Sequence, residues 1–294
     1  IELDYFAIEG RGWKNYLKHI PILKKHLKEV SYDILHAHYS LCGLVALISS
    51  PRKDIVVSFM GDDLYGDSGK NGRIKLSDPF YLLLGRMLQV FIDHIIVKSE
   101  NLAQRVIFKK KMSIIPNGVD TEWFYPMDKR EARDALGLNP NLNILLFLGD
   151  TKNTRKNFQL LRKASSHVKA PFEIITPFPT SSQNVHLYLN AADVLILPSY
   201  KEGSPNVIKE AMACNCPIVS TDVGDVRKVV GNTEGCYITS FKPEEMGAMI
   251  REALEYSSNK GRTQGRERIR ALGYDTKTIA RKIKDLYEAI LKKD

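Results

Sequence analysis

The sequence predicts an α/β fold built from two doubly wound parallel sheets, one in each of two domains. Short apolar runs typical of buried strands alternate along the chain with longer segments that have helical periodicity. Residues 193–221 show this most clearly, because two apolar runs flank a loop and a helical segment. A chain of 294 residues, 44% of them hydrophobic, is long enough for two such domains.

The first part of the chain begins with a basic helix. Residues 1–9 form a strand-like run, and residues 13–30 place apolar side chains at helical spacing with lysines on the remaining surface. We expect this helix to lie on a sheet, with an anionic membrane surface as the alternative. Strands are then predicted within DILHAHY (33–39), DIVVSFM (54–60) and HIIVKS (94–99).

Six further strands and a closing helix follow. The strands are predicted within MSIIPN (112–117), NILLFLG (143–149), FEIITP (172–177), DVLILP (193–198), CPIVST (216–221) and GCYITS (235–240). Apolar residues at helical spacing predict the last helix at 278–291. The turn-rich segment 114–126 marks the passage between domains. We place the domains at 1–111 and 112–275, with 276–294 returning to the first domain.

The net charge limits the kinds of binding partner to expect, and the cysteines indicate the cellular compartment. The formal charge of +9 favours anionic partners, namely a nucleotide diphosphate, an anionic membrane or nucleic acid. Nucleic acid is least favoured, because no finger spacing or basic stripe with interleaved aromatics is present. Gly10-Arg-Gly12 and GDSGKNGR (66–73) do not complete a nucleotide-binding fingerprint, so both are interpreted as turns. Four scattered cysteines and the lack of a long apolar run indicate a cytoplasmic protein, soluble or peripheral at the inner membrane face.

Residues 202–210, EGSPNVIKE, raise the main functional question, because two glutamates surround a stretch that starts a helix. Ser204 suits the N-cap and Pro205 the first helical position. In an open parallel sheet, ligands bind beyond the carboxyl ends of the strands, and helix N-termini attract phosphate. Glu202 would stand there to accept hydrogen bonds from ligand hydroxyls or to balance a positive charge. The alternative is that Glu202 and Glu210 are solvated acids beside a helix.

Several stretches, in chain order, resemble the retaining glycosyltransferases of family 4. They are DILHAHYSLCG (33–43), SFMGDD (58–63), IIPNGVDTEWFYP (114–126), LNAADVLILPS (189–199) and SYKEGSPNVIKEAMACNCPIVSTDVG (199–224). The resemblance covers nearly the whole chain and implies a GT-B fold, in which two Rossmann-like doubly wound domains face a central cleft. The first strand and glycine-rich turn of such an N-terminal domain are not found, so either the sequence begins after them or the protein lacks them.

The resemblance also implies a donor site in the second domain. Glu202 would contact the sugar hydroxyls, Glu210 the ribose, and Lys156 the diphosphate. Gly61 and Asp63 match a motif near the reacting sugar. The expected catalytic residues are therefore Glu202, Lys156 and Asp63, and Gly61 is expected to bind the donor. Capping of the next segment is the alternative for Asp63. The other residues expected to bind the donor are Gly149, Lys152, Arg155, Pro177, Gly203, Ser204, Pro205, Asn206 and Val207.

Two residues depart from the family pattern. Asp150 stands where an arginine that neutralises the diphosphate is expected, so Lys152 or Arg155 would have to replace it. Met60 stands where family members often carry a histidine. These departures make a catalytically weakened nucleotide-binding or partner protein the main alternative to an active enzyme. Sugar-nucleotide epimerisation is a third possibility, but it requires a buried acid and base pair that the sequence does not identify.

The expected activity is transfer of a sugar from a nucleotide-diphosphate donor to an acceptor hydroxyl, with retention of configuration. The acceptor would be a carbohydrate or a lipid-linked molecule of surface polysaccharide or glycolipid synthesis. The resemblance implies no metal and no cofactor besides the donor itself. His36 and His38 face the same side of a strand, but without a third ligand they are interpreted as packed or hydrogen-bonded histidines.

Overall fold

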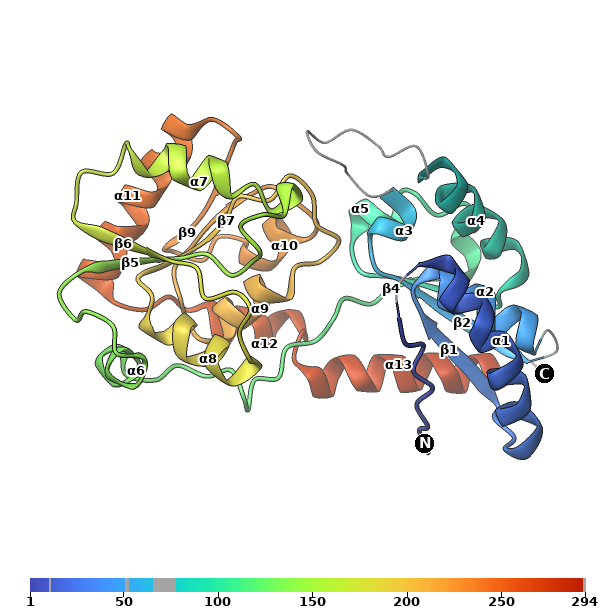
Figure 1. Ribbon diagram of the computed structural model, residues 1–294. Coiled ribbons are helices and arrows are strands. Elements are labelled where there is room, and N and C mark those ends of the chain that lie inside the picture. Colours follow the sequence, from blue (N-terminus) through green and yellow to red (C-terminus); the bar gives the residue numbers. More distant parts are fainter. Residues whose placement is uncertain (11, 51–52, 66–77, 293–294) are drawn as a thin grey trace. The chain divides into compact units, whose positions relative to one another are not determined.

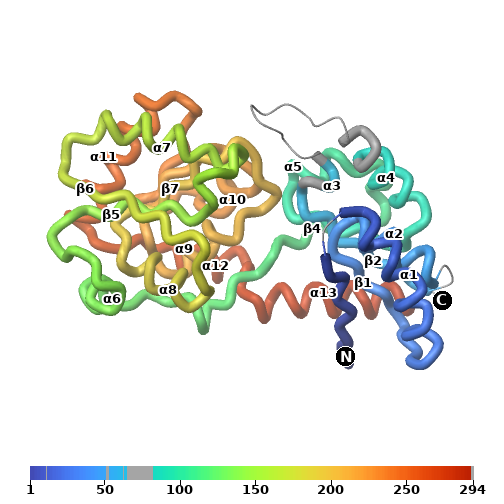
Figure 2. Tube along the Cα trace, viewed as in Figure 1, coloured from blue at the N-terminus to red at the C-terminus, as the bar shows by residue number. Residues whose placement is uncertain are grey.

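The computed structural model describes residues 1–10, 12–50, 53–65 and 78–292, and these fall into two compact units (Figures 1 and 2). Unit 1 holds the described residues up to 116 together with 280–292, and unit 2 holds residues 117–279. The division lies between Pro116 and Asn117, not after residue 111, because the strand at 112–114 pairs within unit 1. The turn expected at 66–73 lies outside the described residues.

Unit 1 is built on a parallel sheet with the strand order β1-β2-β3-β4. The strands are β1 Ile34–His38, β2 Asp54–Phe59, β3 His94–Val97 and β4 Met112–Ile114. The helical elements are α1 Trp13–Glu29, α2 Ser40–Ser49, α3 Asp62–Tyr65, α4 Asp78–Phe91, α5 Glu100–Ala103 and the 3-10 turn η2 Lys109–Lys111. Apolar side chains of the strands pack with those of α2, α4 and α5 to form the core.

The amino-terminal residues differ from the expectation. Residues 1–9 form no strand, so the prediction of one is wrong. Ile1, Leu3 and Tyr5 are each more than 60% exposed, and β1 pairs with β2 alone among the described strands. Helix α1 forms as predicted and buries Leu23, but it packs chiefly against α2.

Unit 2 is built on a parallel sheet with the strand order β6-β5-β7-β8-β9. The strands are β5 Asn143–Leu146, β6 Phe172–Ile175, β7 Val194–Leu197, β8 Ile218–Thr221 and β9 Cys236–Thr239. The helical elements are α6 Lys129–Leu136, η3 Thr154–Lys156, α7 Phe158–Ser165, α8 Ser182–Ala191, α9 Asn206–Ala213, α10 Val226–Val230, α11 Pro243–Lys260 and α12 Gly265–Leu272. Helix α13, Thr276–Leu291, begins in unit 2 and ends in unit 1. The strands predicted between residues 33 and 240 are all confirmed.

Helices cover both faces of the unit 2 sheet (Figure 1). Leu145 and Ile196 pack with α7 and α11 on one face. Leu146 and Leu195 pack with α8, α9, α10 and α12 on the other. Because side chains alternate across a strand, neighbouring residues enter different cores, and the strands read as continuous apolar runs.

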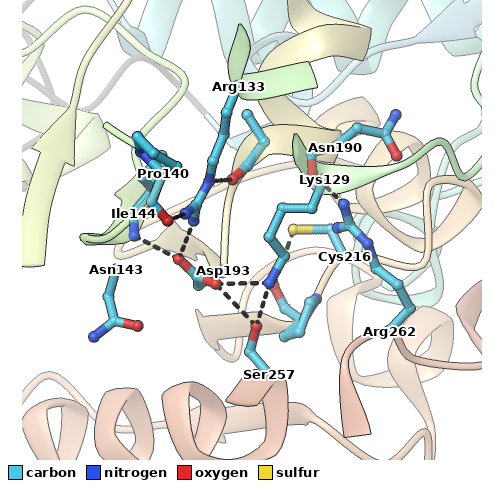
Figure 3. A network of polar contacts seen from close by, with 12 residues as sticks. Lys129, Arg133, Pro140, Asn143, Ile144, Asn190, Asp193, Cys216, Ser257 and Arg262 are labelled. Atoms are coloured by element: carbon cyan, nitrogen blue, oxygen red, sulfur yellow. Dashed lines mark hydrogen bonds and ion pairs between the residues drawn. The ribbon is translucent and has the colours of Figure 1, made fainter. Parts of the chain in front are cut away.

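Asp193 joins several elements at the amino end of β7 (Figure 3). Its Oδ2 accepts hydrogen bonds from Arg133 Nη2 of α6 and from the main-chain N–H of Ile144 in β5, both at 2.7 Å. Its Oδ1 accepts from Lys129 Nζ of α6 at 2.7 Å and from Ser257 Oγ of α11 at 3.2 Å. Burial alone would raise the pKa of Asp193, but Lys129, the Ile144 N–H and Arg133 hold it below its usual value.

Asp193→Asn is expected to lower the free energy of unfolding by about 3 kcal/mol, because it leaves Arg133 and Lys129 without their carboxylate. Urea unfolding followed by circular dichroism measures this change. Glu245→Gln is the control, since Glu245 pairs with Lys242 on the surface, where an ion pair contributes about 1 kcal/mol or less. Equal losses in the two variants would contradict the role given to Asp193.

Candidate active site

The expected donor-binding residues of the second domain, which are all of them except Gly61, follow the carboxyl ends of strands in the unit 2 sheet. Strand β5 lies between β6 and β7, so the chain leaves β5 toward one side of the sheet and returns to β7 on the other. The connections after β5 and β7 therefore diverge, which opens a crevice in folds of this kind. Arg155 and Lys156 follow β5, and Glu202 follows β7.

Asp150 stands in place of the expected arginine, and its carboxylate stabilises a turn by accepting a main-chain hydrogen bond. Its Oδ1 accepts a hydrogen bond from the main-chain N–H of Lys152 at 2.8 Å. The preceding Gly149 lies against the site, since a Cβ there would be 3.4 Å from the Phe147 ring and 3.5 Å from Lys156 Cγ. Lys152 itself is exposed.

The residues after this turn position two cations. Asn153 caps η3 by accepting the main-chain N–H of Arg155 at 3.0 Å. Asn157 then adopts a φ of 51°, and its Nδ2 donates to the Pro198 carbonyl oxygen at 3.1 Å. Because Pro198 follows β7, this bond fixes Arg155 and Lys156 beside the end of that strand.

Glu202 receives both cations. Lys156 Nζ donates to Oε1 at 2.8 Å, and Arg155 Nη1 donates to Oε2 at 2.6 Å. Ser199 Oγ donates to Oε1 at 2.8 Å, and Arg155 Nη1 also donates to the Lys201 carbonyl oxygen at 3.0 Å. The Glu202 side chain is only 9% exposed, so this is a semi-buried ion pair and not a solvated acid.

The charges of this cluster suit an anionic ligand. Burial alone would raise the pKa of Glu202, but Lys156 and Arg155 hold it below its usual value. Two cations share one carboxylate, which leaves one positive charge in excess. A guanidinium carries five N–H donors and an ammonium three, so Arg155 and Lys156 retain donors for a ligand. Of the two replacements considered for the missing arginine, the structure brings Arg155, not Lys152, to Glu202.

The turn between Glu202 and α9 differs from the prediction. Helix α9 begins at Asn206 with Pro205 as its N-cap, so the assignment of Ser204 as N-cap is wrong. Ser204 Oγ instead donates to Asp225 Oδ2 at 2.6 Å. The hydroxyl oxygen in turn accepts a hydrogen bond from Lys209 Nζ, so both its donor and its acceptor serve charged groups, and these charge-assisted bonds are stronger than a bond to a helix N–H.

The remaining expected donor-binding residues also lie in unit 2. Gly203 is half-buried in the turn, and Val207 packs against the core below α9. Asn206 Oδ1 accepts a hydrogen bond from Asn117 Nδ2 at 3.2 Å. Pro177 lies in the irregular segment between β6 and α8, at the same edge of the sheet.

Glu210 lies one turn into α9 and is half-buried. Within the described residues, no group donates a hydrogen bond to its carboxylate. Burial raises the pKa of Glu210 to about 7, with Lys209 partly opposing the shift. A partly buried carboxylate with unused acceptor capacity is suited to ligand hydroxyls.

Gly61 and Asp63 lie in unit 1, where Asp63 serves the backbone. The Asp63 side chain is buried, and its carboxylate accepts hydrogen bonds from the main-chain N–H groups of Ser40 at 3.2 Å, Met60 at 3.0 Å and Gly61 at 2.9 Å. Burial raises its pKa to about 6 against the effect of these amides. Asp63 therefore ties the connections after β1 and β2 together; the amides that donate to it precede α3, so it does not cap the segment that follows it.

His36 is a packed, hydrogen-bonded histidine, as expected. It stacks on His38 with 4.6 Å between ring centroids, contacts Tyr287 Oη through Nδ1, and lies 2.9 Å from Ser58 Oγ through Nε2. Burial lowers the pKa of His36 to about 3, with His38 and Lys98 adding to the shift. The ring is therefore neutral at physiological pH.

Three polar residues of this region were missed by the sequence analysis. Ser199 donates to Glu202, while Lys209 and Asp225 form a buried ion pair with Nζ and Oδ2 3.5 Å apart. One signal was present, because Lys209 falls among the apolar residues of α9 between Ile208 and Ala211. A lysine on a buried helix face requires a partner, but the sequence does not say which.

Two family models match separate parts of the chain. The model described as Glycosyltransferase Family 4 matches residues 4–123, and the model described as Glycosyl transferases group 1 matches residues 143–256. Together they cover most of both units, including Lys156 and Glu202. The chain belongs to glycosyltransferase family 4.

Relatives with assigned names agree with this membership. The chain is 27% identical over 262 residues to a D-inositol 3-phosphate glycosyltransferase of Mycolicibacterium gilvum, a match of 76% of this chain and 59% of that protein. It is 25% identical over 270 residues to D-inositol 3-phosphate glycosyltransferase 2 of Catenulispora acidiphila, a match of 76% of this chain and 63% of that protein. The chain thus spans about three fifths of the length of these relatives.

Solved structures show the GT-B fold for this family 4 chain. Sucrose-phosphate synthase from Thermosynechococcus elongatus aligns with a TM-score of 0.80 at 20% identity, over 96% of this chain and 79% of that chain. Anabaena HepE in complex with UDP-glucose aligns with a TM-score of 0.73 at 17% identity, over 94% of this chain and 82% of that chain. The two Rossmann-like units described above are the two domains of this fold.

Glu210→Gln is expected to raise the melting temperature more at about pH 8 than at about pH 5. The pKa of Glu210 in the folded protein is raised to about 7 from the usual 4.5 of a glutamate, so between these pH values the folded protein keeps a proton that the unfolded chain releases. The free energy of unfolding of the wild type therefore falls as pH rises between these two values, and Gln removes this fall. A difference independent of pH would contradict the assignment. Glu245→Gln is the control, because the pKa of Glu245 is lowered by Lys242 and Ser240 and the carboxylate stays ionised throughout.

Proposed function

We propose that this family 4 protein is a glycosyltransferase that moves a sugar from a nucleotide-diphosphate donor to an acceptor hydroxyl. The observation that carries the proposal is the cluster of Arg155, Lys156 and Glu202 at the β5–β7 switch point, directly before the turn at residues 203–206. Anabaena HepE, which shares the fold, is named as a complex with UDP-glucose. That name supports a nucleotide-sugar donor.

The chemistry of the leaving group explains why this cluster fits. Negative charge builds on the diphosphate as its bond to the sugar breaks, so cations and main-chain amides must surround it. Lys156 and Arg155 supply the cations, and the main-chain N–H groups of Gly203, Ser204 and Asn206 at the start of α9 supply further donors. Arg155 thereby takes the place of the arginine that Asp150 replaces.

Glu202 would act on the sugar and not on the phosphate. When the diphosphate engages Lys156 and Arg155, the carboxylate is released to accept hydrogen bonds from sugar hydroxyls. We propose a front-side reaction with retention: the acceptor oxygen bonds to the anomeric carbon on the face that the diphosphate leaves. The acceptor proton passes to a leaving phosphate oxygen, so no protein carboxylate acts as nucleophile and no metal takes part.

Asp63 and Glu210 have separate roles in this proposal. Glu210 accepts hydrogen bonds from the ribose hydroxyls, which its unused carboxylate permits. Asp63 holds the connections after β1 and β2 in the acceptor-side unit, since the residue is 1% exposed and its carboxylate accepts hydrogen bonds from main-chain amides. We therefore assign Asp63 a positioning role, in place of direct contact with the reacting sugar.

The acceptor is proposed to be a carbohydrate or lipid-linked hydroxyl of surface polysaccharide or glycolipid synthesis, reached from the cytoplasm. Four free cysteines suit that compartment. No helix in the described ranges is long and apolar enough to cross a bilayer. We propose peripheral contact with anionic lipid through one surface of unit 1.

That surface is formed by α4 and the segment 107–111. Its apolar side chains are 39% to 61% exposed and are Leu83, Met87, Val90, Phe91, Ile107 and Phe108. Lys111 Nζ contacts the carbonyl oxygens of Val90 and Ile92, which joins the two segments. Lys109 and Lys110 are exposed beside the apolar residues. Apolar side chains bordered by lysines match an anionic membrane surface.

The function is tested by thermal shift of the wild type with UDP, GDP, ADP, TDP and CMP, with EDTA present. A ligand at about 100 times its dissociation constant should stabilise the protein by roughly 2.7 kcal/mol. We expect one nucleoside diphosphate to stabilise the protein selectively, and its sugar conjugates to be turned over without metal. Binding without turnover of any conjugate would favour the partner-protein alternative, and strict dependence on metal would overturn the proposed reaction.

Lys156→Ala and Glu202→Ala are expected to differ in effect. Lys156→Ala removes a cation from the diphosphate, so it should weaken binding of the diphosphate about tenfold or more while nucleoside binding changes little. Glu202→Ala should reduce the transfer rate much more than nucleotide affinity, because its contact is with the sugar. Calorimetry and initial rates measure the two effects. Equal losses of transfer and nucleotide affinity in Glu202→Ala would contradict its place beside the sugar.

Binding to vesicles tests the proposed membrane surface. The wild type should sediment with phosphatidylglycerol-containing vesicles and not with phosphatidylcholine alone. The double variant Lys109→Glu/Lys110→Glu should weaken this binding by about tenfold or more, because each lysine near an anionic surface contributes about 1 kcal/mol. Lys24→Glu/Lys25→Glu on α1 is the control with the same charge change. If the α1 variant lost more vesicle binding than the Lys109/Lys110 variant, the membrane contact would have to be assigned to α1.

A further inference from the structure

Lys209 is a buried cation inside the donor-binding unit. Its side chain is 1% exposed, and it lies on α9 between the two glutamates. Its Nζ contacts Ser204 Oγ at 2.5 Å and Asp225 Oδ2 at 3.5 Å. Burial lowers the pKa of Lys209, and Asp225 opposes this shift. The ammonium therefore depends on Asp225 and Ser204 for its stability in the folded protein.

Asp225 completes a network that joins three segments. Its side chain is 4% exposed, and its Oδ2 accepts the hydroxyl proton of Ser204 at 2.6 Å. Ser204 belongs to the turn before α9, Lys209 to α9 itself, and Asp225 to the connection between β8 and α10. The position of Ser204 is thus determined by two charged groups from outside its own turn.

The backbone brings the connection and the turn into close contact. Gly224 has a φ of +59°, and a Cβ at this position would lie 2.7 Å from the Gly203 carbonyl oxygen and 3.1 Å from that of Glu202. Only glycine permits this approach. Asp225 follows directly, so its distance from Ser204 is fixed by main-chain packing as well as by the hydrogen bond.

Stability alone does not account for the network. Buried ion pairs are often no more stabilising than apolar residues of similar volume. In addition, Asp225 Oδ1 is buried and has no hydrogen-bond partner among the described residues, which costs free energy in the folded state. A core optimised for stability alone would place apolar side chains here.

We propose that Lys209 and Asp225 are positioning residues of the donor site: their buried ion pair holds the Ser204 hydroxyl and thereby fixes the main-chain N–H groups of the turn, those of Gly203, Ser204 and Asn206, for the diphosphate. This inference rests on the proposed function. The inference assigns Ser204 an anchoring role. Its hydroxyl donates a hydrogen bond to Asp225, so the donor that Ser204 keeps for a ligand is its main-chain N–H. Neither charged residue touches the donor itself.

Paired substitutions separate positioning from stability. Lys209→Met and Asp225→Ala should each lower the melting temperature, because each leaves a buried charge unpaired. The double variant Lys209→Met/Asp225→Ala removes both charges and should recover most of that loss. Its affinity for UDP, or for the diphosphate that binds the wild type best, should nevertheless stay about tenfold or more below wild type, since Ser204 has lost its partners.

Ser204→Ala and Ser204→Thr provide a second test that keeps both charged residues, although Ser204→Ala removes the hydroxyl that bonds to them. Ser204→Ala should weaken diphosphate binding, and Ser204→Thr should retain it, because threonine keeps the hydroxyl. Dissociation constants are measured by calorimetry well below each melting temperature. Wild-type affinity in Ser204→Ala, or in a double variant that folds, would overturn the inference. A wild type that binds no nucleoside diphosphate would instead overturn the proposed function.

Discussion

The arrangement of unit 2 depends on one carboxylate at the amino end of its sheet. Asp193 accepts hydrogen bonds from two cations of α6, from the backbone of β5 and from a hydroxyl of α11. It lies directly before β7, so it fixes the starts of β5 and β7 relative to each other (Figure 3). Because parallel strands of similar length run side by side, fixing their starts also fixes their ends, where Lys156 and Glu202 meet.

Each end of the unit 2 sheet holds a carboxylate paired with two cations, Asp193 at the amino end and Glu202 at the carboxyl end, but the two clusters differ in the donors that surround the carboxylate. At the amino end the carboxylate is surrounded by donors from fixed elements and serves stability. At the carboxyl end the donors are Arg155 and Lys156, which lie in a short 3-10 turn and keep further N–H groups for a ligand. The donors around Asp193 are thus used within the fold, whereas the proposed function has the donor phosphates replace Glu202 beside Arg155 and Lys156.

Features that depend on local sequence pattern could be predicted, whereas features that depend on contacts between distant residues could not. The strands were predictable, because strands buried on both faces read as apolar runs. The place of Glu202 was predictable, since it follows such a run and precedes a helix. Ser204 was assigned wrongly, because its partner Asp225 lies 21 residues away. Arg155 and Lys152 were indistinguishable in sequence, and only the turn closed by Asn153 and Asn157 decides which one reaches the site.

The Glu202 carboxylate also competes with any anionic ligand for Arg155 and Lys156, because it already binds both cations. A carboxylate tethered beside Arg155 and Lys156 has a high effective concentration at that position, which no free monoanion in solution matches. Inorganic phosphate and other small abundant anions must displace it with few contacts of their own. If the donor binds as proposed, its two phosphates displace Glu202 from Arg155 and Lys156, and its sugar hydroxyls then bind the released carboxylate. Under that proposal, Glu202 disfavours small anions that bring no sugar and favours binding of a nucleotide sugar.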